Sequence, residues 1–443
     1  MRSPAGRGPL AQDSRAGLRL TATPDPVPPY SLYVLAVLLV VYTFNFIDRV
    51  VLGILATPIK SDLHLTDTEL GLIGGTAFAL FYTSLGVPIG WLADRVNRVW
   101  IMSAALALWS AFTAVCGLAQ GFPALFIARV GVGVGEAGGV APAYALLADY
   151  FPPRTRARAL GVYSMGIPLG SALALLFGGY LASRFNWRTA FLALGLAGLA
   201  LAPLLLATVR EAQRGVYDRS PPTATRPALS VVVRQLAGKG AFWLLSLGAA
   251  CGSIIGYGLL FWLPSFFQRT YAMTLLEVSR LLAALLLLGG IAGLAVGGYL
   301  ADHYGARSPA AYALIPAIAF TAILPCYALG TSLPLGPVAI ACFLLASALQ
   351  LAWLGPIVTA IQHLVPPAMR ALASALFLFI NNLLGLGLGS LLLGLASDRL
   401  ALHFGSASLR YAILGGTGLY LLAAALLFLA APRLPREFAT QSA

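Results

Sequence analysis

Two groups of charged and polar residues stand inside segments that are otherwise apolar. Asn45, Asp48 and Arg49 lie in one segment, and Arg129 and Glu136 lie in another. On a helix, Asn45 shares a face with positions three and four residues later, while Arg129 and Glu136 are about two turns, or roughly 10 Å, apart. Each mid-membrane charge costs at least ~2.5–3.5 kcal/mol on insertion scales. These groups are therefore expected to face one another or water.

The chemistry that these residues can perform is the linked binding of a proton and an anion. Asp48 and Glu136 can accept protons, and Arg49 and Arg129 would be their partners, with zero net formal charge when all four are ionised. Protonation of one carboxylate removes counter-charge from a neighbouring arginine, which can then bind an anion. The cycle could be symport or exchange. A purely structural polar cluster is the alternative interpretation.

The stretch RVGVGVGEAGG around these charges also contains the spacing of a dinucleotide-binding loop, Gly133-x-Gly135-x-x-Gly138. Such a loop needs a preceding strand, a βαβ unit and an acidic residue about 20 positions later. The flanking residues instead continue one apolar segment, which predicts a membrane helix. Gly131, Gly135 and Gly139 recur every four residues, so they predict a face on which another helix packs closely.

The composition is that of a membrane protein. The chain has 443 residues, of which 59% are hydrophobic and 10% charged, whereas a soluble domain has about 25% charged residues. Twelve apolar segments approach the roughly 20 residues that a helix needs to cross a bilayer. We therefore predict an all-α, polytopic membrane protein with transmembrane helices over residues 31–57, 67–93, 99–119, 122–150, 156–183, 188–208, 240–267, 273–301, 309–330, 334–364, 368–397 and 408–431.

The distribution of basic residues explains the net charge of +13 without nucleic acid binding. With both termini in the cytoplasm, 19 Lys and Arg residues fall on the cytoplasmic side and 7 on the opposite side, and Arg49 and Arg129 lie within spans. This excess follows the positive-inside rule. Residues 1–30 lack the apolar core of a signal peptide and are interpreted as a disordered basic cytoplasmic tail.

Other kinds of chemistry are disfavoured. The 4 cysteines fall within predicted spans and the 4 histidines lack ligand spacing, so we expect no structural disulfide and no metal site. We find no Ser-His-Asp constellation among the spans and no Walker loop, which argues against an enzyme and against an ATP-driven pump. The only coupling partner that we expect is the proton, with no cofactor.

The chain divides into two similar halves. A polar segment rich in Arg, Pro and Ser, residues 209–239, is interpreted as a cytoplasmic linker between six-helix bundles at 31–208 and 240–431, and 432–443 form a C-terminal tail. Two markers repeat between the halves. The GWLAD sequence that begins at Gly90 returns as GYLAD at Gly298, shifted by 208 residues, and the Pro-Pro pair at Pro152 returns at Pro366, shifted by 214.

A further echo, GYLASR closing the fifth span and GLASDR closing the eleventh, predicts a 3+3 inverted repeat within each half. With these repeats, the chain resembles the major facilitator superfamily over essentially its full length. Its signature loop between helices 2 and 3 is similar to Gly90-x-x-x-Asp94-Arg95-x-x-Arg98, and a partial second copy keeps Asp302 and Arg307. The resemblance implies that these residues form a conformational gate that helps to hold one state of an alternating-access cycle.

Several first-half motifs resemble the Spinster family of lysolipid and sphingolipid transporters. They are NFIDR at Asn45, IKSDL at Ile59, TELGL at Thr68, DRVNR at Asp94 and RVGVGVGEAG at Arg129. The second half matches only the general superfamily pattern. This resemblance implies a zwitterionic or anionic lysolipid substrate, such as a lysophospholipid or sphingosine 1-phosphate, with its head group near Arg49.

The second half offers uncharged candidates for substrate contact. Tyr257, Trp353, Asn381 and Asn382 lie in spans 7, 10 and 11, and for the two asparagines a hydrogen bond between helices is an equal alternative. Trp262 is expected to anchor the helix at the membrane interface. The charged candidates for the site thus all lie in the first half. This arrangement fits an amphiphilic substrate whose tail lies among the Leu-rich helices of the second half.

We therefore expect a monomeric, proton-coupled or proton-modulated secondary transporter of an amphiphilic lipid in a bacterial inner membrane. A transporter of small organic anions or drugs on the same fold is the alternative.

Overall fold

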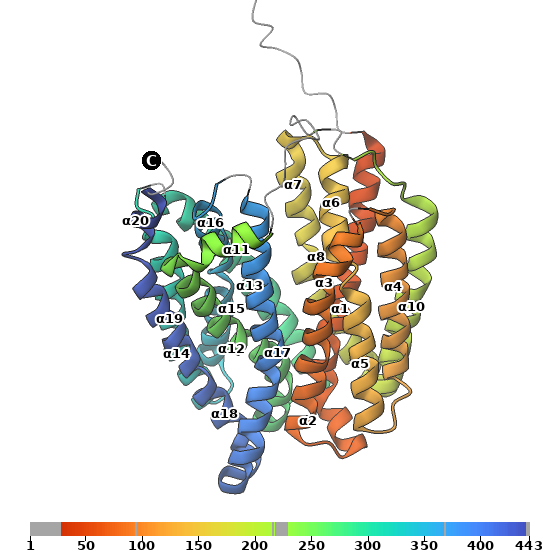
Figure 1. The fold of residues 1–443 in the computed structure, drawn as a ribbon. Helices are drawn as coiled ribbons and strands as arrows, with labels where there is room; N and C mark the ends of the chain where they lie inside the picture. The colour runs from red at the N-terminus through yellow and green to blue at the C-terminus, as the bar shows by residue number, and fades with distance from the viewer. Residues whose placement is uncertain are drawn as a thin grey trace, which may run out of the picture.

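The computed structural model describes residues 28–93, 95–214, 217, 229–305, 307–366 and 369–439. Within these ranges the chain is helical and contains no β-strand (Figure 1). The helices are α1 (Pro29–Leu63), α2 (Asp67–Gly71), α3 (Ala77–Ala93), α4 (Arg98–Cys116), α5 (Phe122–Glu136), α6 (Val140–Tyr150), α7 (Pro153–Ser164), α8 (Gly166–Leu173), α9 (Gly179–Arg184), α10 (Trp187–Thr208), α11 (Leu229–Ala237), α12 (Gly240–Tyr271), α13 (Leu275–Gly305), α14 (Ala311–Ser332), α15 (Pro337–Leu351), α16 (Leu354–His363), α17 (Arg370–Phe404), α18 (Ser408–Gly416), α19 (Gly418–Ala430) and α20 (Leu434–Ala439).

The twelve predicted spans are recovered. In the described residues, eleven segments are long and apolar enough to cross a membrane. The last of them, Leu372–Ala430, covers two predicted spans: α17, and, after a short 3₁₀ turn, α18 with α19. Some spans are assembled from consecutive pieces: a π-helical turn joins α2 to α3, another joins α8 to α9, and short breaks separate α5 from α6 and α15 from α16. The all-α, two-half architecture predicted from the sequence is confirmed.

Local sequence signals explain where several helices begin. Thr66 and Glu69 form a capping box at the start of α2, in which each side chain pairs with the other's backbone amide. Asn97 and Asn186 accept hydrogen bonds from the first turns of α4 and α10. Pro123 lies in the first turn of α5, where a proline costs no hydrogen bond.

The largest differences from the sequence prediction are at polar helix ends. The first helix continues six residues beyond its predicted end, because Lys60 and Asp62 in its last turn pair with Asp67 and Arg188 instead of ending the helix. Residues 229–237 of the predicted linker form α11, and part of the predicted tail forms α20. Apolar length alone does not predict these helical segments, because they lie outside the apolar stretches that identify the spans.

The glycine-rich face of the fourth span packs against α4, as predicted. A Cβ atom added at Gly131 would meet the ring of Phe112, and one added at Gly135 would lie 2.5 Å from the backbone nitrogen of Trp109. Gly139 faces the Trp109 ring at an ordinary contact distance. These small residues let α5 approach α4 closely enough for backbone contact, which holds the two charged residues of α5 in place.

Gly135→Ala is therefore expected to lower the melting temperature by about 5 °C, because overpacking costs about 1–3 kcal/mol. Thermal unfolding of the purified protein in detergent would measure the shift. Gly86→Ala is the matched control, since a Cβ at Gly86 meets nothing within 4 Å. Equal melting temperatures for the two variants would contradict the packing argument.

The two halves meet at the end of the bundle opposite α11 and α20 (Figure 1). There α2 and α3 pack against α17, and α8 and α9 pack against α13. A Cβ at Gly71 would lie 2.5 Å from the carbonyl oxygen of Ser390, and one at Gly179 would meet the side chain of Ser279 on α13. Gly90 and Gly298 lie toward the other end of the same helices, where an added Cβ would meet nothing within 4 Å. We call this second end the linker end.

Candidate functional site

A buried ion pair joins the first span to the fourth. Arg49 Nε donates to Glu136 Oε2 at 2.7 Å, and Asn45 Nδ2 donates to the same oxygen at 2.8 Å. Glu136 is fully buried, whereas the Arg49 side chain keeps 11% of its surface accessible. The i and i+4 spacing of Asn45 and Arg49 on α1 places both donors on one carboxylate. The two segments predicted to face each other therefore do so.

Asp48 and Arg129 extend this cluster without a direct side-chain pair among the described contacts. Arg129 Nη1 donates to the backbone carbonyl of Asp48 at 3.2 Å, and both residues are almost completely buried. The charges of Arg129 and Glu136 both act on the Asp48 carboxyl group. The four charged residues thus form one group, although the direct partner of Glu136 is Arg49 and that of Arg129 is a carbonyl oxygen.

Aromatic rings surround the two arginines, and sequence reasoning missed them. The guanidinium carbon of Arg49 lies 4.4 Å from the ring centre of Tyr82, 5.0 Å from that of Phe46 and 5.2 Å from that of Phe78. Phe78 also lies 5.5 Å from the guanidinium of Arg129. Cation–π contacts of this kind are worth more when desolvated. The four-residue spacing of Phe78 and Tyr82 could have indicated a shared helix face.

Five polar atoms of this cluster are buried and have no hydrogen-bond partner in the described part of the chain. They are Asn45 Oδ1, Asp48 Oδ1, Arg49 Nη2, Arg129 Nε and Glu136 Oε1. Buried polar atoms in proteins nearly always have a partner, so a concentration of unpaired ones at one place is unusual. Glu136 Oε1 can take a proton and Arg49 Nη2 can donate to an anion, so both halves of the predicted linkage have an available atom.

The second half contributes uncharged side chains. Tyr257 on α12 is half-buried and lies beside Gly385 and Gly389 of α17. Asn381 Oδ1 accepts a hydrogen bond from Ser253 Oγ at 2.7 Å. This bond joins α17 to α12, as in the alternative to substrate contact that was considered for the asparagines. Asn382 is half-buried. Trp353, in the break between α15 and α16, packs edge-on against Phe377.

The internal repeat shows that the second half carries a neutral copy of the charged group. The 208-residue shift relates Asn45 to Ser253 and Arg49 to Tyr257, and the 214-residue shift relates Glu136 to Gln350. Like Glu136, Gln350 reaches across to the first helix of its own half, where its Nε2 donates to Gly256 O at 3.2 Å. It also accepts from Tyr327 Oη at 3.4 Å. The geometry of the site is thus duplicated, but its charges are not.

The predicted gate residues lie at the linker end of the first half and after the matching helix of the second. Arg95 stacks over Trp91 at 3.6 Å and donates to its carbonyl oxygen. Asp302 and Arg307 are exposed, and Asp94 lies outside the described residues. Gly90, already described, faces open space.

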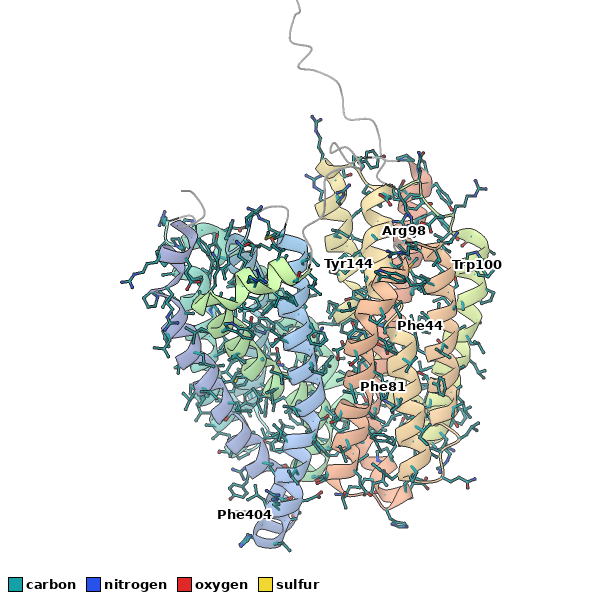
Figure 2. All side chains as sticks on the ribbon, viewed as in Figure 1. Phe44, Phe81, Arg98, Trp100, Tyr144 and Phe404 are labelled. Carbon is teal, nitrogen blue, oxygen red and sulfur yellow. The ribbon has the colours of Figure 1, made fainter. Side chains whose placement is uncertain are left out.

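Arg98 is the gate residue with the largest set of partners. It is buried and pairs with Asp149 at 2.6 Å and with Glu211 at 2.5 Å, close to the start of the linker (Figure 2). Sequence reasoning did not anticipate these two acids. They connect the loop before α4 to α6 and to the residues after α10, all within the first half.

Trp262, which the sequence suggested as an interface anchor, is packed between helices. Its side chain is fully buried, and its Nε1 donates to the carbonyl oxygen of Ser390 at 2.8 Å. The close approach of α12 to α17 at Gly258 and Gly389 brings this ring into the helix contact. A tryptophan near a span end can thus serve packing as well as anchoring.

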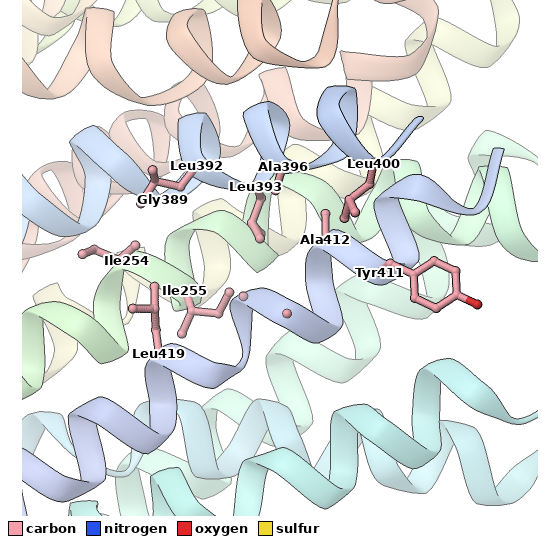
Figure 3. Close-up of a pocket in the computed structure, with 12 residues that line it drawn as sticks. Ile254, Ile255, Gly389, Leu392, Leu393, Ala396, Leu400, Tyr411, Ala412 and Leu419 are labelled. Atoms are coloured by element: carbon pink, nitrogen blue, oxygen red, sulfur yellow. The ribbon is translucent and has the colours of Figure 1, made fainter. Parts of the chain in front are cut away.

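An apolar cavity of about 140 Å³ lies apart from the charged cluster of α1 and α5, among α12, α17, α18 and α19 (Figure 3). Its lining includes Ile254, Leu393 and Leu419 but none of the predicted substrate-binding residues. No group of His, Cys, Asp and Glu able to hold a metal ion occurs in the described residues.

Comparisons with known proteins identify the fold and the transporter class. Residues 38–390 match the Major Facilitator Superfamily. A protein named MFS-type efflux pump from Mycolicibacterium smegmatis is 35% identical over 385 residues, which are 85% of this chain and 87% of that protein. Human Protein spinster homolog 1 is 28% identical over 394 residues, which are 84% of this chain and 74% of that protein.

A solved structure described as a bacterial homolog to the human lysosomal transporter Spinster, in an inward-facing and unoccupied conformation, has a TM-score of 0.85 and 32% identity. The match covers 93% of this chain and 98% of that one. The chain belongs to the Major Facilitator Superfamily and is a Spinster-type member of it. It is an integral, multi-pass membrane protein and a secondary transporter, and its relatives are transporters rather than enzymes.

Proposed function

We propose that this protein transports an amphiphilic anionic or zwitterionic lipid, such as a lysophospholipid or a sphingosine 1-phosphate-like molecule, and that protons drive or modulate the transport. The observation that carries the proposal is the buried Arg49–Glu136 pair, in which each partner keeps one buried polar atom that has no hydrogen-bond partner among the described residues. A buried pair of this kind could be replaced by apolar packing without loss of stability, so its cost points to a function.

The linkage between proton and anion follows from charge balance. When Glu136 is ionised, it neutralises Arg49, and an anion would have to compete with a carboxylate that is already 2.7 Å away. A proton on Glu136 Oε1 removes that negative charge and leaves Arg49 with an uncompensated positive charge. Arg49 is the more accessible partner, and it can then bind the phosphate of a lipid head group. Asp48 would tune the balance through its charge.

The neutral second half fits the remainder of an amphiphile. The counterpart of Arg49 in the repeat is the uncharged Tyr257, and the counterpart of Glu136 is Gln350. A head group bound at Arg49 would meet polar but uncharged partners from α12, while a tail would have the Leu-rich helices beyond them. This arrangement supports a lipid over a dianionic, fully polar cargo.

The contact between the halves defines a conformational state. The halves meet at the end opposite the linker and diverge toward the linker end (Figure 1). With the termini in the cytoplasm, as the positive-inside rule indicates, we propose that this state is open to the cytoplasm. In the other state of the alternating-access cycle, the linker end would be closed. We propose that the protein acts as a monomer in a bacterial inner membrane.

The second candidate function is transport of small organic anions or drugs. The name of the M. smegmatis relative as an efflux pump favours it. Arg49 would bind either kind of anion, so the charged cluster alone does not distinguish them. The difference lies in whether an acyl chain contributes binding free energy.

Binding assays with matched ligands test the proposal. We expect a lysophospholipid with a long acyl chain to raise the melting temperature at mildly acidic pH, and its head group alone, as glycerophosphocholine, to have little effect. Each buried methylene contributes about 0.8 kcal/mol, so a series of chain lengths should show graded stabilisation. Stabilisation by short-chain organic acids but not by lysolipids would reject the lipid and support the second candidate.

A further inference from the structure

A row of aromatic rings leads away from Arg49 across three helices of the first half. The ring centre of Phe46, one turn earlier on α1, lies 5.0 Å from the guanidinium carbon. Tyr42, another turn earlier, meets Phe46 edge-on at 5.2 Å. Tyr42 stacks on Tyr163 of α7 at 4.4 Å, with the ring planes 6° apart. Tyr163 in turn meets Tyr144 of α6 at 5.3 Å, nearly at a right angle. We name Tyr42, Tyr144 and Tyr163 the tyrosine cluster.

This row leads toward the open end of the molecule. The helix α1 begins at the linker end, where Tyr30 in its first turn donates to the carbonyl oxygen of Thr208 at the end of α10. Each step from Arg49 back to Tyr42 therefore moves toward the linker end. A ligand that enters between the halves from that end would pass the tyrosine cluster before it reaches Arg49.

Tyr144 is the accessible member of the tyrosine cluster. It is 37% exposed, whereas Tyr42 and Tyr163 are 7% and 2% exposed. In Figure 2 it lies on the side of the first half that faces the second half. Its hydroxyl group is 3.5 Å from Ser164 Oγ, and its ring packs against Tyr163. The Tyr144 ring is thus held in place at two points while part of its surface stays open.

Packing between helices accounts for the two buried members but not for Tyr144. The Tyr42–Tyr163 stack joins α1 to α7, and a Cβ added at Gly166 would lie 3.0 Å from the Tyr42 ring. These contacts fill the space between the helices. An exposed ring beyond them adds little to such packing, so its accessible surface is available to a ligand.

The rings of the tyrosine cluster are free to bind a cation. Phe46, Phe78 and Tyr82 already carry the Arg49 guanidinium at 4.4–5.2 Å. In the described part of the chain, no arginine or lysine lies over a ring of the tyrosine cluster. The negative face of an aromatic ring attracts ammonium groups, and quaternary ammonium ligands are commonly recognised in this way.

A zwitterionic head group needs a second binding group of this kind. In phosphocholine, an ethylene link joins the phosphate to a quaternary ammonium. If Arg49 binds the phosphate, Glu136 is protonated, so its carboxyl group cannot neutralise the ammonium. Asp48 is 2% exposed and is equally unable to reach it. Aromatic rings recognise such a cation without adding a negative charge that would compete with the phosphate for Arg49.

We propose that the tyrosine cluster, through the exposed ring of Tyr144, binds the ammonium group of a zwitterionic lysolipid whose phosphate is held by Arg49. This inference rests on the proposed function and makes it more specific. The protein selects choline lysolipids over lysolipids that have a phosphate but no cation. Tyr42 and Tyr163 act as positioning residues for Tyr144.

The test compares two lysolipids that have the same acyl chain but different head groups, lysophosphatidylcholine and lysophosphatidate. Tyr144→Leu is expected to raise the Kd for lysophosphatidylcholine about fivefold or more, and to change the Kd for lysophosphatidate by less than about twofold. Tyr144→Phe keeps the aromatic face and should bind both lipids like the wild type. Binding is measured by isothermal titration calorimetry at pH 6, on variants that unfold cooperatively.

Tyr180→Leu is the matched control. Tyr180 is a 49% exposed tyrosine on α9 of the same half, outside the tyrosine cluster, and its loss should leave both Kd values unchanged. Equal weakening of both lipids in Tyr144→Leu would overturn the inference, because it would indicate a general loss of shape. Unchanged affinity for lysophosphatidylcholine in that variant would overturn it as well.

Lysophosphatidate also separates this inference from the proposed function. If the wild type binds lysophosphatidate but Tyr144→Leu has no effect on lysophosphatidylcholine, only the ammonium site is rejected. If the wild type binds neither lysolipid, the proposed function is rejected and the ammonium site with it.

Discussion

Replacing Arg49 by alanine is expected to raise the Kd for an anionic lysolipid by about 30-fold or more. Removing one partner of a buried, hydrogen-bonded charge pair costs about 2–5 kcal/mol, and 2 kcal/mol corresponds to this factor. Arg49 is the accessible member of the charged cluster and the one whose Nη2 lacks a partner in the described structure. Arg129 is almost fully buried and is held on the Asp48 carbonyl group, so it is poorly placed to substitute.

Two variants separate recognition from stability in this experiment. Arg49→Lys keeps the charge but loses the planar group that stacks on Tyr82, so it should retain part of the affinity. Arg188→Ala applies the same truncation to an arginine at the far end of the first half and should bind normally. Binding would be measured by isothermal titration calorimetry at pH 6, after confirming cooperative unfolding. Wild-type affinity in Arg49→Ala would exclude Arg49 as the head-group site.

Glu136→Gln is expected to make lipid binding nearly independent of pH. Glutamine resembles the protonated carboxylic acid in shape and charge, so the variant should hold Arg49 in its anion-accepting state at every pH. In the wild type, affinity should fall as pH rises, because Glu136 ionises and neutralises Arg49. In the variant, the Kd should change by no more than about twofold between pH 5.5 and 8, with Asp48 responsible for what remains.

Proteoliposome uptake of a labelled lysolipid, driven by imposed pH gradients, extends this test to transport. The variant should lose acceleration by a proton gradient while it keeps exchange of lipid between the two faces. Glu69→Gln is the control, because Glu69 lies at the start of α2, outside the charged cluster, and glutamine can replace it in the capping box. A wild-type response of Glu136→Gln to pH would count decisively against a role in coupling.

Much of the fold could be predicted because the membrane imposes a simple code. Segments of sufficient apolar length indicated all twelve spans, and repeated motifs such as GWLAD at Gly90 indicated the two halves. The helices that the apolar pattern missed, α11 and α20, lie in segments assigned to the linker and the tail. The extension of α1 was also missed. Its last turn pairs Lys60 with Asp67, which follows a turn, and Asp62 with Arg188, which is distant in sequence.

The candidate site was predictable where its members are costly in lipid. Arg49 and Glu136 are conspicuous within apolar helices, and helical spacing placed Asn45 beside Arg49. Which acid meets which arginine depends on the rotation and depth of α5 relative to α1, and no local pattern contains that information. The aromatic rings were missed for another reason. Phe and Tyr are common in membrane helices, so the spacing of Phe78 and Tyr82 indicates a shared helix face but not that this face meets Arg49.

The two halves share the geometry of the site, but only the first half carries its charges, and this difference affects how such proteins can diversify. If both halves descend from one ancestral six-helix unit, one copy has kept or gained ionisable groups where the other has Ser253, Tyr257 and Gln350. Substitutions in the neutral copy leave the Arg49–Glu136 pair intact. Descendants can therefore acquire a new cargo shape through one copy while they inherit the charged residues of the other unchanged.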